Sequence, residues 1–182
     1  DIKAVANIAK SVGAVTVVDN VFTTPIFSNA LSLGADVVVY SATKHIDGQG
    51  RTLGGVTLGS GDYIRNTVEP FMKHTGGSMS PFTGWVLLKG LETLDLRVQA
   101  QSDSAMEIAK SLIGHESISS VIYPGLETHP QYDLCMEQME KGGTVIAFEL
   151  LGGKEAAFSL MNSLKIVLIS CLLYTSPSPR DF

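Results

Sequence analysis

A small set of polar side chains in this 182-residue sequence could act together on one small molecule: Asp19, Asn20, Ser41, Thr43 and Lys44. A carboxylate beside a ring nitrogen keeps that nitrogen protonated, because an opposite charge within hydrogen-bond reach favours the cationic form. A lysine amine condenses with an aldehyde to give a Schiff base, and hydroxyl groups donate to phosphate oxygens. A basic ring nitrogen, an aldehyde and a phosphate occur together in pyridoxal phosphate, which would use each of these groups.

Two short β-branched runs precede these side chains. Val15 to Val18 ends at Asp19, and Asp36 to Tyr40 ends at Ser41. Helical periodicity before the first run and a short helix predicted over 25–33 give the order helix, strand, helix, strand, which is typical of a parallel α/β sheet. Both runs are predicted to be buried strands. Ligands bind at the carboxyl ends of such strands, so we expect Asp19 and Lys44 to face one crevice.

Each motif also has a plain structural interpretation. An Asp-Asn pair after a strand is often a turn or a helix cap, and a Ser-x-Thr-Lys cluster is often a solvated loop. A receiver-like signalling domain would also place an Asp and a Lys after parallel strands, but it needs a further acidic pair that the sequence does not show. A non-catalytic relic that keeps the fold and binds nothing is a third possibility.

The remainder of the chain predicts a second α/β segment. A glycine-rich stretch follows Lys44 and holds one candidate strand, 54–58. A long helical pattern from Phe82 to His115, entered through a Ser80-Pro81 cap, suits a connector between domains. Strands are predicted at 121–123 and 144–150, and helices at 133–139 and 154–164. The predicted domains are therefore 1–105, 106–170 and a separate tail, 171–182.

Composition narrows the classes of partner. The net charge of −5, with 45% hydrophobic and 17% charged residues, fits a globular protein and disfavours nucleic acid as the main partner. No apolar run reaches the roughly 18 residues that span a bilayer. Cys135 and Cys171 form no disulfide framework, which favours the cytoplasm. His74, His115 and His129 lack metal-ligand spacing, so we predict no metal site.

Several segments resemble the Cys/Met-metabolism family of pyridoxal-phosphate enzymes. They are VVDNVFTTP (17–25), ADVVVYSATKHIDGQGRTLGG (35–55), SPFTGWVLLKGLETLDLRV (80–98) and YPGLETHPQYDL (123–134). Many family members read Gly-His-Ser-Asp where this chain has Gly48-Gln49-Gly50-Arg51, and Gln-Gly-Arg is typical of the sulfhydrylase branch. His45 stands where a Tyr is commoner and is interpreted as a substituted neighbour of the lysine. Arg51 and Arg65 are interpreted as solvated.

The resemblance implies a fold-type-I transferase with Lys44 as the Schiff-base lysine and catalytic residue. It further implies that Asp19 partners the ring nitrogen and that Ser41 and Thr43 bind the cofactor phosphate. The implied activity is γ-replacement on an amino-acid substrate, O-succinyl- or O-acetylhomoserine, with sulfide to give homocysteine in methionine biosynthesis. Cystathionine γ-synthase and γ-lyase are the alternatives within the family.

The resemblance also implies a partial active site. The chain would cover the second half of the large domain and the start of the small C-terminal domain. The family's ring-stacking Tyr, its upstream glycine loop and the arginine for the substrate carboxylate would fall outside the sequence. We therefore expect this fragment alone to be inactive, and the full-length protein to be a dimer-based homotetramer. The final stretch, CLLYTSPSPRDF (171–182), resembles adapter read-through and is expected to be non-native.

Overall fold

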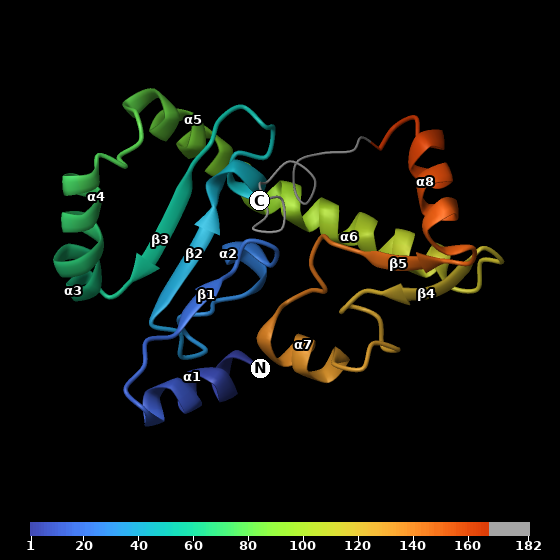
Figure 1. Ribbon diagram of the computed structural model, residues 1–182, viewed down its shortest axis with the longest axis horizontal. Helices are drawn as coiled ribbons and strands as arrows, with labels where there is room; N and C mark the ends of the chain where they lie inside the picture. The colour runs from blue at the N-terminus through green and yellow to red at the C-terminus, as the bar shows by residue number, and fades with distance from the viewer. Residues whose placement is uncertain (168–182) are drawn as a thin grey trace.

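A pair of parallel strands forms the centre of the first half of the molecule. The computed structural model describes residues 1–167. Strand β1 (Val17–Asp19) pairs in parallel with β2 (Val37–Ser41), with Asp19 opposite Val39. On the other side of β2, β3 (Gly55–Gly59) runs antiparallel. Figure 1 shows these three strands side by side. The predicted parallel pair is confirmed, although both strands begin and end slightly later than expected.

One face of this sheet is packed, and the other is open along β1, although Val37 of β2 is buried on that face too. Val38 and Tyr40 are buried against Phe27, Leu87 and Val98, which belong to the main hydrophobic core. Side chains alternate between the two faces of a strand, so the neighbouring positions point the opposite way. There Val17 is 56% exposed and Asp19 is exposed. The expectation that both faces of β1 are buried is therefore wrong for the described residues.

Helices cover the packed face and flank the sheet. Helix α1 (Ile2–Ser11) begins at Asp1, whose carboxylate accepts a hydrogen bond from the backbone N–H of Ala4. Helix α2 (Thr24–Phe27) is shorter than the predicted helix over 25–33. It ends early because the Asn20 side chain, rather than a further helical turn, binds the carbonyls of Thr24 and Ser28.

The long helical pattern is two helices rather than one. Ser80 accepts a hydrogen bond from Thr83 N at 3.1 Å, and this cap opens α5 (Pro81–Leu91) as predicted. The chain leaves helical geometry at Thr93, and α6 (Leu94–Leu112) follows. Residues 61–75, which the sequence analysis did not assign, are also helical. They form α3 (Gly61–Tyr63), the π-helical turn η2 (Ile64–Val68) and α4 (Glu69–Thr75).

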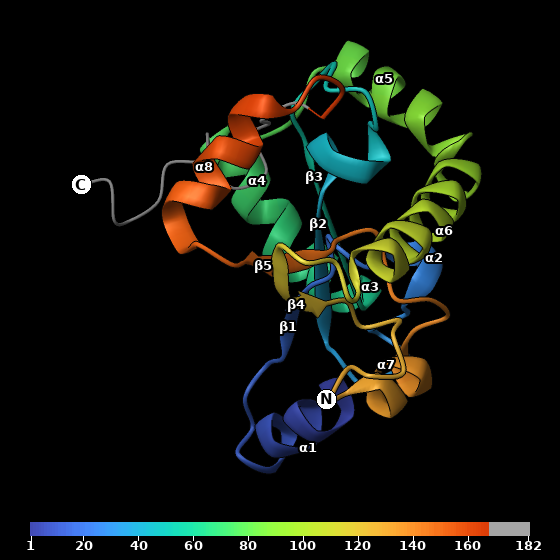
Figure 2. The same ribbon diagram turned by 90° about the vertical axis from the view of Figure 1, so that its right-hand side faces the viewer.

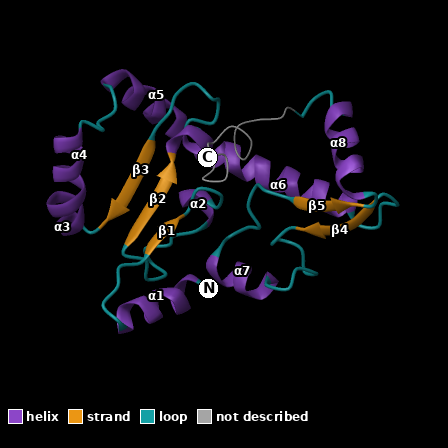
Figure 3. Cartoon of the chain, viewed as in Figure 1, coloured by secondary structure: helices purple, strands orange, loops and turns teal. Residues whose placement is uncertain are grey.

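A second hydrophobic cluster lies on the C-terminal half of α6. Strands β4 (Ile118–Ile122) and β5 (Ala147–Leu150) pair antiparallel beside this helix. Figures 2 and 3 show α7 (Tyr132–Gln138) and α8 (Gly153–Ser163) beside these strands. Helix α6 contributes Leu94 and Val98 to the first core and Ala105 and Ala109 to the second. It therefore connects the two clusters, while the domain boundary at residue 105 stays a prediction.

The two halves also touch away from α6. Ile2 N donates to Gln138 Oε1 at 3.0 Å, and Glu140 N donates to the carbonyl of Phe27 at 2.9 Å. Within residues 1–167, no helix is both long enough and apolar enough to cross a membrane. The predicted tail, 171–182, lies outside the described residues.

Candidate active site

Asp19 and Ser41 lie at the same edge of the sheet and on the same face. Asp19 ends β1 opposite Val39, and Ser41 ends β2 two residues further on. Side chains two positions apart on a strand share a face, so Asp19, Val39 and Ser41 point the same way. Two residues of strand advance about 6.6 Å and neighbouring strands lie about 4.8 Å apart, which puts roughly 8 Å between the Cα atoms of Asp19 and Ser41. One small aromatic molecule can bridge that gap.

Lys44 follows β2 in the π-helical turn η1 (Ala42–Ile46). Its backbone is not helical, with φ −86° and ψ −111°, and its side chain is half-buried. Thr43, immediately before it, is tied to the strand that returns from the glycine-rich loop. Gly54 N donates to Thr43 Oγ1 at 3.0 Å, and Thr43 Oγ1 donates back to the Gly54 carbonyl at 3.4 Å. The Thr43 hydroxyl thus anchors the turn from which Lys44 projects.

The loop after Asp19 is organised by Asn20. The buried Asn20 amide donates to the carbonyls of Thr24 and Ser28 and to the Tyr40 hydroxyl, while its Oδ1 accepts from the Thr23 hydroxyl. Thr24 sits in the left-handed region with φ 59°, a conformation that costs energy for a β-branched residue. The carboxylate of Asp19 accepts a hydrogen bond from Val21 N at 3.1 Å. These contacts fix the direction in which the chain leaves Asp19.

A buried acid and an arginine close the glycine-rich loop after Lys44. Asp47 is fully buried and accepts hydrogen bonds from Arg51 N at 2.7 Å and from Arg51 Nε at 2.9 Å. Burial alone would raise the pKa of Asp47, but the hydrogen bonds from Arg51 and Gln49 and the charge of Arg51 outweigh it and lower that pKa. Arg51 is exposed, as predicted, but its guanidinium also pairs with the buried Asp47, which the solvated interpretation did not include. Its spacing of four residues from Asp47 was the available signal.

A second arginine, on α6, forms hydrogen bonds to the same turn. Arg97 donates to the carbonyls of His45, Ile46 and Gly90 at 2.8, 3.3 and 2.8 Å. The sequence analysis did not single out Arg97, because nothing in the helical pattern marks it as a residue that reaches back some 50 positions along the chain. Gly90 lies on the adjacent helix, so the arginine joins α5, α6 and η1.

His45 borders a cavity between the two halves. Its Nε2 lies 2.9 Å from Thr144 Oγ1. The cavity has a volume of about 580 Å³ and is lined by His45, Thr144 and residues of α6 and of the segment before β5. Burial, and then the positive charge of Arg97, lower the pKa of His45, with the backbone of Val21 partly opposing them. The ring is therefore held neutral beside the Lys44 turn.

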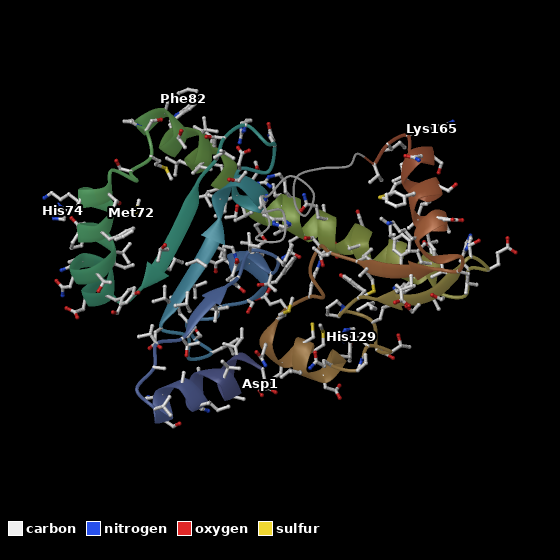
Figure 4. The ribbon with its side chains drawn as sticks, in the orientation of Figure 1. Asp1, Met72, His74, Phe82, His129 and Lys165 are labelled. Atoms are coloured by element: carbon white, nitrogen blue, oxygen red, sulfur yellow. The ribbon has the colours of Figure 1, made fainter. Side chains whose placement is uncertain are left out.

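The other histidines lie away from this place. His74 is on α4, at one end of the molecule, and His129 is on the loop that leads to α7 (Figure 4). In residues 1–167, no three His, Cys, Asp or Glu side chains are grouped so as to hold a metal ion.

Comparison with known proteins shows the family of this chain. The model of the Cys/Met metabolism PLP-dependent enzymes matches residues 1–173. The chain belongs to this family. It is 52% identical over 174 residues to an O-succinylhomoserine sulfhydrylase of Mycobacterium tuberculosis and 45% identical over 170 residues to one of Pseudomonas aeruginosa. It covers 43% and 42% of those two proteins, so it spans less than half the length of the curated relatives that it matches.

Solved structures of the family share its fold. A cystathionine gamma synthase from Xanthomonas oryzae superposes with a TM-score of 0.89 at 35% identity, over 93% of this chain and 44% of that one. A cystathionine gamma lyase from Micromonospora echinospora gives a TM-score of 0.89 at 32% identity, over 94% and 45%. The predicted fold, part of a fold-type-I enzyme, is confirmed. The family uses pyridoxal phosphate.

The donor set at the sheet edge fits this cofactor. It offers an amine, a carboxylate and two hydroxyls, which match an aldehyde, a ring nitrogen and a phosphate respectively. The structure brings Asp19, Ser41, Thr43 and Lys44 to the carboxyl ends of two adjacent parallel strands. Their individual roles remain predictions.

Proposed function

We propose that this chain supplies the lysine and acid side of a pyridoxal-phosphate site that catalyses γ-replacement on an activated homoserine. The observation that carries the proposal is the position of Asp19 and the Lys44 turn at one edge of a parallel strand pair. In this proposal Lys44 Nζ binds the cofactor aldehyde covalently. Asp19 faces the pyridine nitrogen, and its negative charge keeps that nitrogen protonated. When bound, the protonated ring serves as the electron sink for a carbanion at the substrate α-carbon.

The hydroxyls have different tasks in this arrangement. Ser41 shares its face with Asp19 and donates to the cofactor phosphate. Thr43 donates to the same phosphate by giving up the long 3.4 Å contact to the Gly54 carbonyl, while it keeps the 3.0 Å bond from Gly54 N. The turn therefore stays anchored while the phosphate is bound.

Lys44 also moves protons. Once freed from the cofactor, Nζ would accept the proton from the substrate α-carbon as a general base. The β-proton leaves next, the succinate or acetate on the γ-carbon is expelled, and sulfide adds at that carbon. The β-carbon then regains a proton, and Nζ returns one to the α-carbon. The balanced outcome is O-acylhomoserine plus sulfide giving homocysteine plus the free carboxylic acid.

Sulfide is the proposed nucleophile because the two sulfhydrylases cited above are 52% and 45% identical to this chain. A second candidate is γ-elimination, since an L-methionine gamma-lyase of Porphyromonas gingivalis is 41% identical over 95% of the chain. The two outcomes differ in whether sulfide adds at the γ-carbon or the unsaturated product is released and hydrolysed to a 2-oxo acid and ammonia. We also propose that the protein acts as a homo-oligomer, as the family does.

A product assay separates these activities. The full-length protein that carries this chain is given pyridoxal phosphate and O-succinylhomoserine, with sulfide, with cysteine or with neither. Homocysteine formed with sulfide at a rate well above the other two products supports the proposal. Cystathionine as the dominant product indicates a γ-synthase, and a 2-oxo acid with ammonia indicates a lyase. Lys44→Ala is the control, and turnover in that variant would rule out the assigned lysine.

A further inference from the structure

The guanidinium of Arg97 binds the backbone directly after Lys44. Its Nη1 donates to the carbonyl of His45 at 2.8 Å, and its Nη2 donates to that of Ile46 at 3.3 Å. Nη2 also donates to the carbonyl of Gly90 at 2.8 Å, and Nε donates to Thr93 Oγ1 at 3.1 Å. All three nitrogens of the fork are thus engaged, and two of the three carbonyls belong to the residues that follow the lysine.

Two glycines let the backbone approach the fork closely. A Cβ atom on Gly48 would come within 2.1 Å of Arg97 Nη1, and one on Gly90 would come within 2.1 Å of the Ile46 carbonyl oxygen. Gly48 also has φ +72°, which favours glycine. The turn, the end of α5 and the start of α6 therefore meet without room for another side chain. Because Arg97 binds the carbonyls of His45 and Ile46 directly, loss of its fork would release the backbone that follows Lys44.

The arrangement requires arginine in particular. The planar guanidinium presents five N–H donors in a rigid fork, whereas a lysine ammonium is a compact point charge on a flexible stem. Lysine at 97 could keep one carbonyl, but it could not hold three carbonyls on two separate segments. A charge-conserving replacement therefore separates the effect of the fork from the effect of the positive charge.

We propose that Arg97 is a positioning residue for Lys44: it clamps the carbonyls of residues 45, 46 and 90 and so sets where the lysine amine lies. This inference rests on the proposed function of Lys44. It reaches further, because Arg97 lies outside the cofactor donor set and acts only through the backbone. Catalysis is sensitive to such placement, since an error of about 1 Å in a reacting group can cost about 100-fold in rate.

Arg97→Lys in the full-length protein, with exposed Arg65→Met as the matched control, tests this proposal. For each variant we would measure two cofactor properties: the dissociation constant for pyridoxal phosphate and the pH titration of its absorbance when bound to Lys44. We would also measure kcat, KM for the amino acid and the thermal midpoint. We expect Arg97→Lys to weaken cofactor retention about tenfold, shift the absorbance titration, and lower kcat by about 100-fold, with KM within about twofold. Arg65→Met should change none of these.

A gentler variant keeps the test decisive if Arg97→Lys folds poorly. Thr93→Val removes only the partner of Nε and loosens the fork, so it should move cofactor retention and the absorbance titration in the same direction by a smaller amount. A lower thermal midpoint with unchanged cofactor retention, absorbance titration and kcat would overturn the positioning role. Failure of the proposed function gives a different result, because borohydride would then fix no cofactor on Lys44 in the unmodified protein.

Discussion

Lys44 is constrained on both sides along the chain. Thr43 before it is bonded to Gly54, and the carbonyls of the two residues after it are held by Arg97. Asp19 across the strand pair is exposed and carries only a hydrogen bond from Val21 N among those described for its carboxylate. The two residues that we assign to the cofactor thus differ in kind. The backbone around Lys44 is held in place by its neighbours, whereas the carboxylate of Asp19 is exposed and can reach a ligand.

Asp19→Asn should therefore impair activity without unfolding the protein. The amide keeps the shape but cannot hold the ring nitrogen in its charged form, so we expect kcat to fall by roughly 10²–10³-fold and the thermal midpoint to change little. Steady-state kinetics and thermal melts check this, with exposed Asp133→Asn as the control. Activity within a factor of two of the unmodified enzyme would contradict the assignment of Asp19 to the ring.

Asp47→Asn should act on stability instead. The carboxylate is buried and accepts two bonds from Arg51, so its loss should lower the free energy of unfolding by about 2 kcal/mol at pH 7. The lowered pKa of Asp47 gives stability that is fully present above its unfolded pKa of 3.8 and is lost as the pH falls through the folded value. Urea unfolding at pH 7 and pH 3 should therefore show a smaller difference between variant and parent at pH 3. An equal difference at both values would argue against this ion pair, and exposed Asp62→Asn is the control.

At the level of elements, the site depends on how closely α5 approaches η1. Sequence periodicity predicted both strands, the capped start of α5 and the helices of the second half. It could not predict that β3 runs antiparallel, because strand direction depends on pairing partners and not on local residue type. It also predicted one long helical pattern from Phe82 to His115. In the structure the helix break comes at Thr93, and Gly90 lets the helix backbone contact the Ile46 carbonyl.

Two glycines of α5 offer a matched pair. Gly90→Ala would place a Cβ 2.1 Å from a backbone oxygen, so overpacking of about 1–3 kcal/mol should exceed the helix-propensity gain. Gly84→Ala meets only Met79 Sδ at 3.8 Å and should gain up to about 1 kcal/mol. Chemical unfolding of both variants measures the two effects. A stabilising Gly90→Ala would show that α5 does not press on the turn.

At the scale of the whole molecule, hydrogen bonds as well as α6 join the two halves of the described chain. One of them is the His45–Thr144 hydrogen bond, which connects the residue after Lys44 to the segment before β5. Such pairing between positions 99 residues apart could not be predicted from sequence, and neither could the links made by Arg97. The placement of Asp19, Ser41, Thr43 and Lys44 at the strand ends could be predicted, because it depends on the local strand pattern and not on distant contacts.

The neutral state of His45 predicts a pH effect on this link. Its folded pKa lies below the unfolded value of 6.5, so the unfolded chain binds more protons in the window between the two. Stability should therefore be constant above about pH 7 and decline as the pH falls below 6.5. His45→Gln should flatten that decline, whereas exposed His74→Gln should leave it in place. Unfolding free energies from pH 5 to pH 8 measure this, and an unchanged slope in His45→Gln would refute it.

The most direct test of the account is to find where the cofactor attaches. The full-length protein that carries this chain is incubated with pyridoxal phosphate, reduced with borohydride, digested and mapped by mass spectrometry. The account predicts one stoichiometric adduct, on Lys44, which is absent in Lys44→Ala. An adduct on a different lysine, or none on a protein that shows activity, would contradict the claim that this turn carries the reactive amine.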